Sequence, residues 1–320
     1  MNFDLNDEER ALQQGIRDVC KRLFPMDRVR SLEEEPGGLD RKLWRELGDA
    51  GVFSLRLPEP DGVGLGMTQA ILIFEELGRA IVPGPLISTH LAAGLIDGAS
   101  TGDAIVGMTE RERVPRAIGH LATLDVVLVM AVDEIRSVEA ASIRGTSIDR
   151  PLDPLTPMHL VAEVPNGERI AGPDVITRWR LEGAALIATM EAGIASACVE
   201  QAVSYAKERK QFGRVIGSFQ AVKHICADML VRAEVARAAS YAAGVMLDDP
   251  SAGDAARAVA GARLLAAEAA IANGKANIQV HGGMGYTWEV DAHLYLKRAV
   301  VLATRFGRGD AWAESIAATL

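Results

Sequence analysis

Apolar residues recur at helical spacing over the first part of the chain. In residues 4–24 they fall three or four positions apart, which predicts an amphipathic helix with Asn6 or Asp7 as its N-cap. The same spacing predicts a second helix within residues 41–55. It also predicts two more within residues 68–96, separated by a turn that contains two prolines and a glycine. The chain therefore begins with helices.

The helical spacing of apolar residues is lost in the middle of the chain and resumes after it. Residues 125–132 and 158–164 are short β-branched runs between turn residues, as expected for strands. Three long, Ala-rich segments without proline follow, at residues 181–210, 220–246 and 254–280. They predict long helices packed antiparallel in a bundle. Helices, then strands, then helices indicate an α+β fold and not a doubly wound sheet.

These patterns predict three consecutive domains. An N-terminal α-helical domain covers residues 1–98, and a small middle β-domain covers residues 99–180. A C-terminal four-helix bundle covers residues 181–320. A chain of 320 residues is long enough to bury a core in each of them.

Composition limits the class of protein. The net charge of −9 disfavours nucleic-acid binding, although Lys and Arg gather in residues 207–214. Three cysteines without a paired spacing fit a reducing compartment, and they indicate neither a disulfide framework nor a metal site. The acidic start is not a signal peptide, and no apolar run reaches the ~18 residues of a membrane span. We therefore expect a cytoplasmic protein without a nucleic-acid partner or a membrane span.

Two segments differ from the helical pattern around them. Residues 208–222 read ERKQFGRVIGSFQAV, where one long helix ends and Gln220 opens the next. Cations followed by Gly are typical of an ordinary helix C-cap; the alternative is a loop that presents Gln211 and Phe212 to a ligand. Residues 278–286 read IQVHGGMGY. Glycines of this kind let backbone N–H groups approach a phosphate closely.

Together with ELGDAGVFSLRLPEPDGVGLG at residues 46–66 and FEELGR at residues 74–79, these segments resemble the acyl-CoA dehydrogenase family. The resemblance follows the chain in order over nearly its whole length. It implies a helical domain, a β-domain and a four-helix bundle. It also implies αβ-dehydrogenation of an acyl-CoA thioester with FAD as cofactor, and an electron-transfer flavoprotein as the usual acceptor.

In this family the RKxFG loop of one subunit and the QxxGGxG turn of its dimer mate bind the same FAD. The resemblance therefore implies that the loop contacts the pyrophosphate and adenine side of the cofactor. It implies that the turn approaches the FAD of the neighbouring subunit. The residues concerned are Arg209, Gln211, Phe212 and Gln220 for the loop, and Gln279, Gly282 and Gly283 for the turn. A guanidinium pairs well with pyrophosphate, which supports the assignment physically.

The chemistry of the family needs a carboxylate that removes the α-proton while the β-hydrogen leaves as hydride to the flavin. Most members carry this base after the GGxGY turn, at a position that falls on Phe306 here. A minority carry it early in the first bundle helix, at the position of Gly183. Glu182 is then the nearest candidate, but a shift of one residue rotates a helical side chain by about 100°. Glu191 lies on another face of that helix.

The middle domain also departs from the family. It is short, and it lacks the TEPxAGSD-like and Trp-Ile-Thr-Asn-like stretches that hold the flavin ring and the acyl-CoA. One hypothesis is a base-lacking partner chain, as in actinobacterial heterotetramers that act in fatty acid or steroid degradation. The alternative is a self-sufficient homo-oligomeric dehydrogenase, such as a homotetramer, in which Glu182 is a displaced catalytic base.

Overall fold

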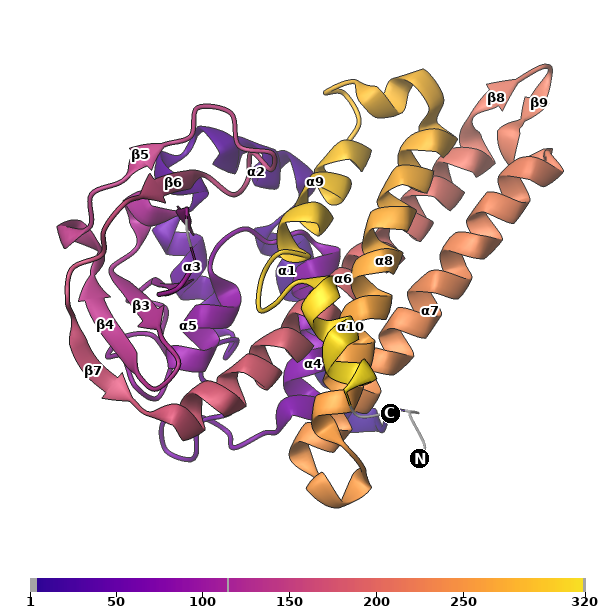
Figure 1. Ribbon diagram of the computed structural model, residues 1–320. Coiled ribbons are helices and arrows are strands. Elements are labelled where there is room, and N and C mark those ends of the chain that lie inside the picture. Colours follow the sequence, from indigo (N-terminus) through magenta and orange to yellow (C-terminus); the bar gives the residue numbers. More distant parts are fainter. Residues whose placement is uncertain (1–4, 114, 319–320) are drawn as a thin grey trace. The chain divides into compact units, whose positions relative to one another are not determined.

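The computed structural model describes residues 5–113 and 115–318 (Figure 1). The chain forms two compact units. The bundle unit comprises residues 1–21, 67–82 and 184–320, and the mixed unit comprises residues 22–66 and 83–183. Helices α1 (Asp7–Leu23) and α6 (Pro173–Glu208) each contribute residues to both units. The three consecutive domains expected from the sequence stay a prediction, since the two units interleave segments from those ranges.

The bundle unit is built of long helices that alternate in direction along the chain (Figure 1). Helix α8 packs against α7, α9 and α10, and α4 packs against α7. Besides its parts of α1 and α6, the helices of this unit are α4 Met67–Arg79, α7 Gln220–Asp248, α8 Ala255–His281, α9 Ala292–Leu302 and α10 Gly309–Ala317. Its hairpin consists of β8 Lys210–Gln211 and β9 Arg214–Val215, and its 3₁₀ turns are η5 Ile216–Ser218, η6 Pro250–Ala252 and η7 Gly282–Tyr286.

One buried amide in α8 ties three helices of this unit together. The Asn273 Nδ2 donates to the carbonyl oxygen of Ala195 in α6 at 3.1 Å and to that of Met229 in α7 at 2.9 Å. Its Oδ1 accepts from Arg232 Nε at 2.9 Å. Burying an amide without hydrogen-bond partners would lower the stability of the fold. These three bonds therefore fix the register of α6, α7 and α8 relative to one another.

Helices α4 and α6 meet backbone to backbone. A Cβ at Gly78 would lie 2.2 Å from the carbonyl oxygen of Met190, and a Cβ at Gly193 would lie 2.1 Å from that of Glu75. Neither position has room for any side chain. The two glycines therefore set the distance between α4 and α6.

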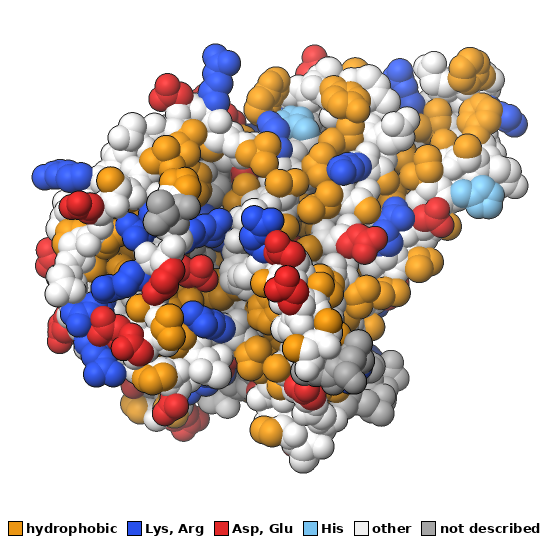
Figure 2. Space-filling model, in the orientation of Figure 1, with side chains coloured by type: hydrophobic (Ala, Val, Ile, Leu, Met, Phe, Trp, Pro, Cys, Tyr) orange, Lys and Arg blue, Asp and Glu red, His pale blue; other side chains and the backbone are white. Residues whose placement is uncertain are grey.

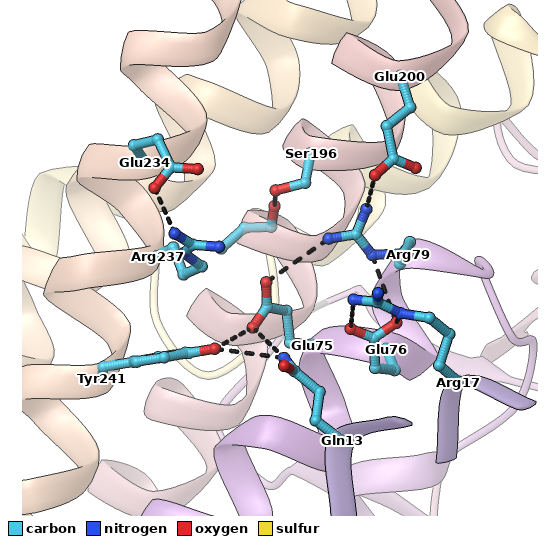
Figure 3. A network of polar contacts seen from close by, with 11 residues as sticks. Gln13, Arg17, Glu75, Glu76, Arg79, Ser196, Glu200, Glu234, Arg237 and Tyr241 are labelled. Carbon is cyan, nitrogen blue, oxygen red and sulfur yellow. Dashed lines mark hydrogen bonds and ion pairs between the residues drawn. The ribbon is translucent and has the colours of Figure 1, made fainter. Parts of the chain in front are cut away.

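A polar network beside this crossing joins α1, α4 and α7 (Figure 3). Arg17 forms two hydrogen bonds to the buried Glu76 carboxylate, at 2.8 and 2.7 Å. The Glu75 Oε2 accepts from the Tyr241 hydroxyl at 2.6 Å and from Gln13 Nε2 at 3.2 Å. Burial raises the pKa of Glu75, and the hydrogen bond from Tyr241 opposes that rise. Both acids are engaged by neighbouring helices, which indicates a structural role for the network.

The mixed unit contains two small sheets and short helices. The first sheet has the order β1-β3-β4-β7, with β1 parallel to β3 and the other pairs antiparallel; the second has the order β2-β6-β5 and is antiparallel throughout. Helix α5 packs against β1. The strands are β1 Val106–Glu110, β2 Arg116–Gly119, β3 Val126–Met130, β4 Ile135–Glu139, β5 Thr146–Ser147, β6 Met158–Val161 and β7 Glu168–Ala171. The helices are α2 Met26–Ser31, α3 Arg41–Asp49 and α5 Leu86–Ala92, with 3₁₀ turns η1 Leu32–Glu34, η2 Pro36–Gly38, η3 Leu121–Thr123 and η4 Ala140–Ser142.

The α+β fold and the helices predicted near the N-terminus are confirmed. Asn6 is the N-cap of α1: its Oδ1 accepts from the Glu9 N–H at 2.8 Å, and its own N–H donates to Glu9 Oε2 at 3.0 Å. Of the strands in the mixed unit, the pattern predicts only β3 and β6. It misses β1 and β4, although each has five residues of which two are β-branched, and it misses the shorter β2, β5 and β7. Helix α6 begins at Pro173, ahead of the predicted start at residue 181, with the proline at a first position that tolerates it.

Helix α6 is long and apolar enough to cross a membrane by length and composition alone. However, 89% of its most apolar 18-residue window is buried inside the protein. A helix that is apolar on all sides and covered on all sides is a core helix. The predicted absence of a membrane span agrees with this burial, whereas the cytoplasmic location stays a prediction.

Candidate functional site

The predicted loop residues lie on the hairpin that connects α6 to α7 (Figure 1). The Arg209 N–H donates to the Tyr205 carbonyl oxygen at 2.8 Å, and the Arg209 carbonyl oxygen accepts from the Ile216 N–H at 2.8 Å. These two bonds hold the base of the hairpin. Phe212 and Gly213 form its two-residue turn, with φ of 53° and 77°. Tight hairpin turns of this kind need positive φ, which is uncommon for a residue as bulky as Phe.

The hairpin exposes an aromatic ring and several cations. Phe212 is 90% exposed. Within the described part of the chain, no carboxylate lies at ion-pair distance from Arg209, Lys210 or Arg214, and the Arg214 guanidinium lies 4.1 Å from the centre of the Phe219 ring. Cations without a partner in their own chain attract an external anion.

The glycine turn follows α8 directly. Gly282 ends the helix at φ 61° and ψ −140°, a conformation that only glycine adopts readily. At Gly285 a Cβ would lie 2.6 Å from the Ile278 carbonyl oxygen, so the turn folds back onto α8. At Gly283, which has no positive φ, a Cβ would meet nothing within 4 Å among the described residues. The chain itself therefore gives no reason for a glycine at this position, and the space above it is open to a group from outside.

The two elements lie at the same end of the bundle unit (Figure 1). Gln279 is exposed in the last turn of α8, and Gln220 is exposed at the first position of α7. Side-chain cations on the hairpin and open backbone at the turn are groups that fit a diphosphate. The predicted assignment of these residues to FAD stays a prediction.

The candidate for the catalytic base, Glu182, is already paired. It belongs to the mixed unit, and its side chain is 6% exposed. Its Oε1 accepts from Arg56 Nη2 at 2.6 Å and lies 3.9 Å from Arg178 Nε. The oxygen is therefore already the acceptor of a hydrogen bond from Arg56, which opposes a role as a general base.

Glu191, also in α6, and the position expected for the usual base are engaged as well. Glu191 is buried and pairs with Arg263 of α8. Burial raises the pKa of Glu191 to about 7, against the attraction of Arg263. Arg263 Nη2 also donates to the Arg305 carbonyl oxygen at 3.2 Å, next to Phe306, which has a positive φ of 50°. The segment after α9 is thus held by Arg263 and offers no carboxylate at residue 306.

The sequence pattern does not reveal these arginine partners. Arg56 lies 126 residues from Glu182, and Arg263 lies 72 residues from Glu191. Neither has a local spacing that marks it as a partner. Among the residues that the structure describes, no cluster of His, Cys, Asp and Glu could hold a metal ion.

Comparison with family models decides the classification. Residues 6–102 match the acyl-CoA dehydrogenase N-terminal domain, and residues 172–320 match the C-terminal domain of the same family. The chain belongs to the acyl-CoA dehydrogenase family. Neither of these two matches covers residues 103–171, which contain all the strands that the structure describes in the mixed unit. The family consists of oxidoreductases, which confirms the class of enzyme predicted from the motifs.

Two mycobacterial relatives match almost the whole chain. The acyl-CoA dehydrogenase IpdE2 of Mycobacterium tuberculosis (strain ATCC 25618 / H37Rv) is 35% identical over 303 residues, 92% of this chain and 91% of the relative. The acyl-CoA dehydrogenase FadE34 of the same strain is 33% identical over 323 residues, 91% of this chain. The chain spans only 44% of the length of FadE34.

Solved structures agree on the fold. The ChsE4-ChsE5 complex from Mycobacterium tuberculosis has a TM-score of 0.84 with 22% identity, and the match covers 99% of this chain and 98% of that chain. PigA, solved with FAD and proline, has a TM-score of 0.83 with 19% identity, covering 100% and 99%. At this identity the likeness establishes the fold alone.

Proposed function

We propose that this chain is the base-lacking partner subunit of a heteromeric, FAD-dependent acyl-CoA dehydrogenase. The complex would desaturate the αβ bond of an acyl-CoA thioester. This chain would supply cofactor-binding elements, and a second acyl-CoA dehydrogenase chain would supply the catalytic carboxylate. The observation that best supports this proposal is the Arg56–Glu182 ion pair. It engages the candidate base, whereas the candidate cofactor-binding elements are exposed.

FAD, when bound, would accept the β-hydrogen of the substrate as hydride. The hairpin cations, with Arg209 foremost, would neutralise its pyrophosphate. The exposed Phe212 ring would lie against the adenine side, since a flat apolar ring suits a purine face. Gly283 would let the backbone of the turn approach the FAD bound chiefly by a neighbouring subunit.

An exposed apolar face on α7 supports the proposal that this chain binds a partner chain. Leu230, Val231 and Val235 are 50%, 63% and 45% exposed. Hydrophobic side chains line the surface along α7 and at the hairpin end of the bundle unit (Figure 2). Contiguous exposed apolar side chains on a helix are typical of an interface between subunits. The face has the chemistry that a second helical bundle would cover.

The comparisons favour a different chain over a second copy as that partner. One structural neighbour is a complex of two named proteins, ChsE4 and ChsE5. FadE34 is long enough to hold a second segment of this size beside the one that matches here. We extend the proposal to a cytoplasmic heterotetramer that passes its electrons to an electron-transfer flavoprotein.

One observation favours the self-sufficient enzyme. IpdE2, a relative of nearly the same length, is named as an acyl-CoA dehydrogenase. Under this alternative Glu182 is the base, because it lies beside the position at which a minority of the family carries it. The two functions make opposite predictions for a Glu182 variant.

Glu182→Gln is expected to leave substrate turnover unchanged within about twofold, because Gln still accepts a hydrogen bond from Arg56 and the base lies on the partner chain. The measurement is acyl-CoA oxidation by the complex of this chain with a co-expressed full-length acyl-CoA dehydrogenase chain from the same genome. If Glu182 were the general base, the rate would fall about 100- to 10,000-fold. FAD content and the denaturation midpoint of the same samples separate a lost base from a misfolded chain.

Gly283→Ala is expected to leave the stability of the lone chain unchanged within about 0.5 kcal/mol, because the added Cβ meets no neighbour. The same change is expected to weaken FAD binding by the complex about 5- to 100-fold, the equivalent of overpacking a close contact. Thermal denaturation and FAD titration provide the two readouts.

Gly285→Ala is the matched control for this prediction. Its Cβ would clash with the Ile278 carbonyl oxygen at 2.6 Å, so this variant is expected to destabilise the lone chain itself. Unchanged FAD affinity in Gly283→Ala would contradict a role for the open turn in holding the cofactor.

A further inference from the structure

An aromatic stack joins the two candidate cofactor-binding elements within one chain. The rings of Tyr205 in α6 and His281 in α8 lie 4.2 Å apart, centre to centre, at an interplanar angle of 26°. Tyr205 stands one helical turn before Arg209, and its carbonyl oxygen accepts the Arg209 N–H that opens the hairpin. His281 is the last residue of α8, directly before Gly282. The stack therefore connects the base of the hairpin to the base of the turn.

The His281 ring is fixed on its own helix as well. Its Nδ1 lies 2.9 Å from the carbonyl oxygen of Asn277. A carbonyl oxygen only accepts, so Nδ1 carries the proton and donates it. This bond holds the imidazole along the last turn of α8, and the ring then has one open face for Tyr205. Two contacts in different directions make it a rigid support.

The turn packs against α8 and α9. Gly285 packs against α8, where a Cβ would lie 2.6 Å from the Ile278 carbonyl oxygen and 3.1 Å from the His281 Cβ. Gly282 and Gly283 have open space where a Cβ would be, and the Tyr286 side chain is largely exposed. His281 thus stacks on Tyr205 through its ring and lies beside Gly285 through its Cβ, which places this residue between the stack and the turn.

We propose that Tyr205 and His281 are positioning residues that set the glycine turn relative to the cationic hairpin. The inference rests on the proposed function, in which the two elements serve two different FAD molecules of the complex. The stack then makes this chain a link between the two cofactor sites. Neither residue needs to touch FAD in order to control how firmly the turn holds it.

The test compares Tyr205→Leu, which removes the aromatic face, with Tyr205→Phe, which keeps it. Amide hydrogen exchange is measured on the lone chain, and FAD dissociation is followed by flavin fluorescence from the complex with the co-expressed full-length dehydrogenase chain. In Tyr205→Leu, the amide hydrogens of residues 282–287 are expected to exchange about 2- to 10-fold faster than in the wild type, whereas the exchange rates in α7 stay unchanged. FAD should leave the complex faster by a similar factor. Tyr205→Phe should behave like the wild type in both measurements.

Equal exchange rates at residues 282–287 in all three proteins would overturn the inference, and so would equal losses in the Leu and Phe variants. His281→Ala, which also removes the stack, replaces Tyr205→Leu should that variant fail to fold. A wild-type complex that holds no FAD would overturn the proposed function instead. The exchange measurement on the lone chain would still decide whether the stack positions the turn.

Discussion

Gly193→Ala is expected to lower the free energy of unfolding of the lone chain by about 1–3 kcal/mol, the usual cost of overpacking. The added Cβ would lie 2.1 Å from the Glu75 carbonyl oxygen and 2.8 Å from the Arg79 backbone nitrogen. Both atoms belong to the backbone of α4, so the clash is relieved only if α4 and α6 move apart. That movement would also disturb the network around Glu75 (Figure 3). Urea or thermal denaturation measures the effect.

Gly261→Ala is the matched control, because it makes the same chemical change inside α8. Its Cβ would meet nothing within 4 Å, so only helix propensity acts. Replacing a helical Gly by Ala then stabilises by roughly 0.5–1 kcal/mol. Opposite signs for the two variants would show that the contact with α4, and not the loss of glycine as such, destabilises Gly193→Ala. Equal signs would contradict the close approach of α4 and α6.

The long helices are the part of the fold that the sequence predicts best. Their spacing extends over several turns, and of the two predicted N-cap residues, Asn6 and Asp7, the structure has Asn6 at the start of α1. The short strands of the mixed unit are predicted poorly. Strand β5 has two residues and β7 carries Glu168 and Arg169, so neither presents an apolar alternation. Their pairing depends on distant strands that no local pattern identifies.

The candidate site also has a part that the sequence predicts and a part that it does not. The hairpin and the glycine turn are visible in the sequence because turns need particular residues at particular φ, as Gly213 and Gly282 illustrate. The engagement of Glu182 is not visible, because Arg56 approaches it only in the folded chain. A carboxylate in the sequence near an expected catalytic position is therefore weaker evidence than a carboxylate whose neighbours are known.

The central claim is that this chain offers cofactor-binding elements to a partner and lacks its own catalytic base. The expected effect on cofactor content is large, because this chain would retain FAD only when the partner chain is bound to it. The lone chain keeps its hairpin cations exposed, but it has neither the flavin-ring stretches of the family nor the second subunit that would close the site. It is therefore expected to bind FAD too weakly to retain it through purification.

The most direct test is the visible absorption spectrum of this chain, purified first alone and then after co-expression with a full-length acyl-CoA dehydrogenase chain from the same genome. The account predicts a colourless protein in the first case. In the second it predicts a yellow complex that contains both chains and oxidises an acyl-CoA. A lone chain that is yellow and oxidises an acyl-CoA without the second chain would contradict the account.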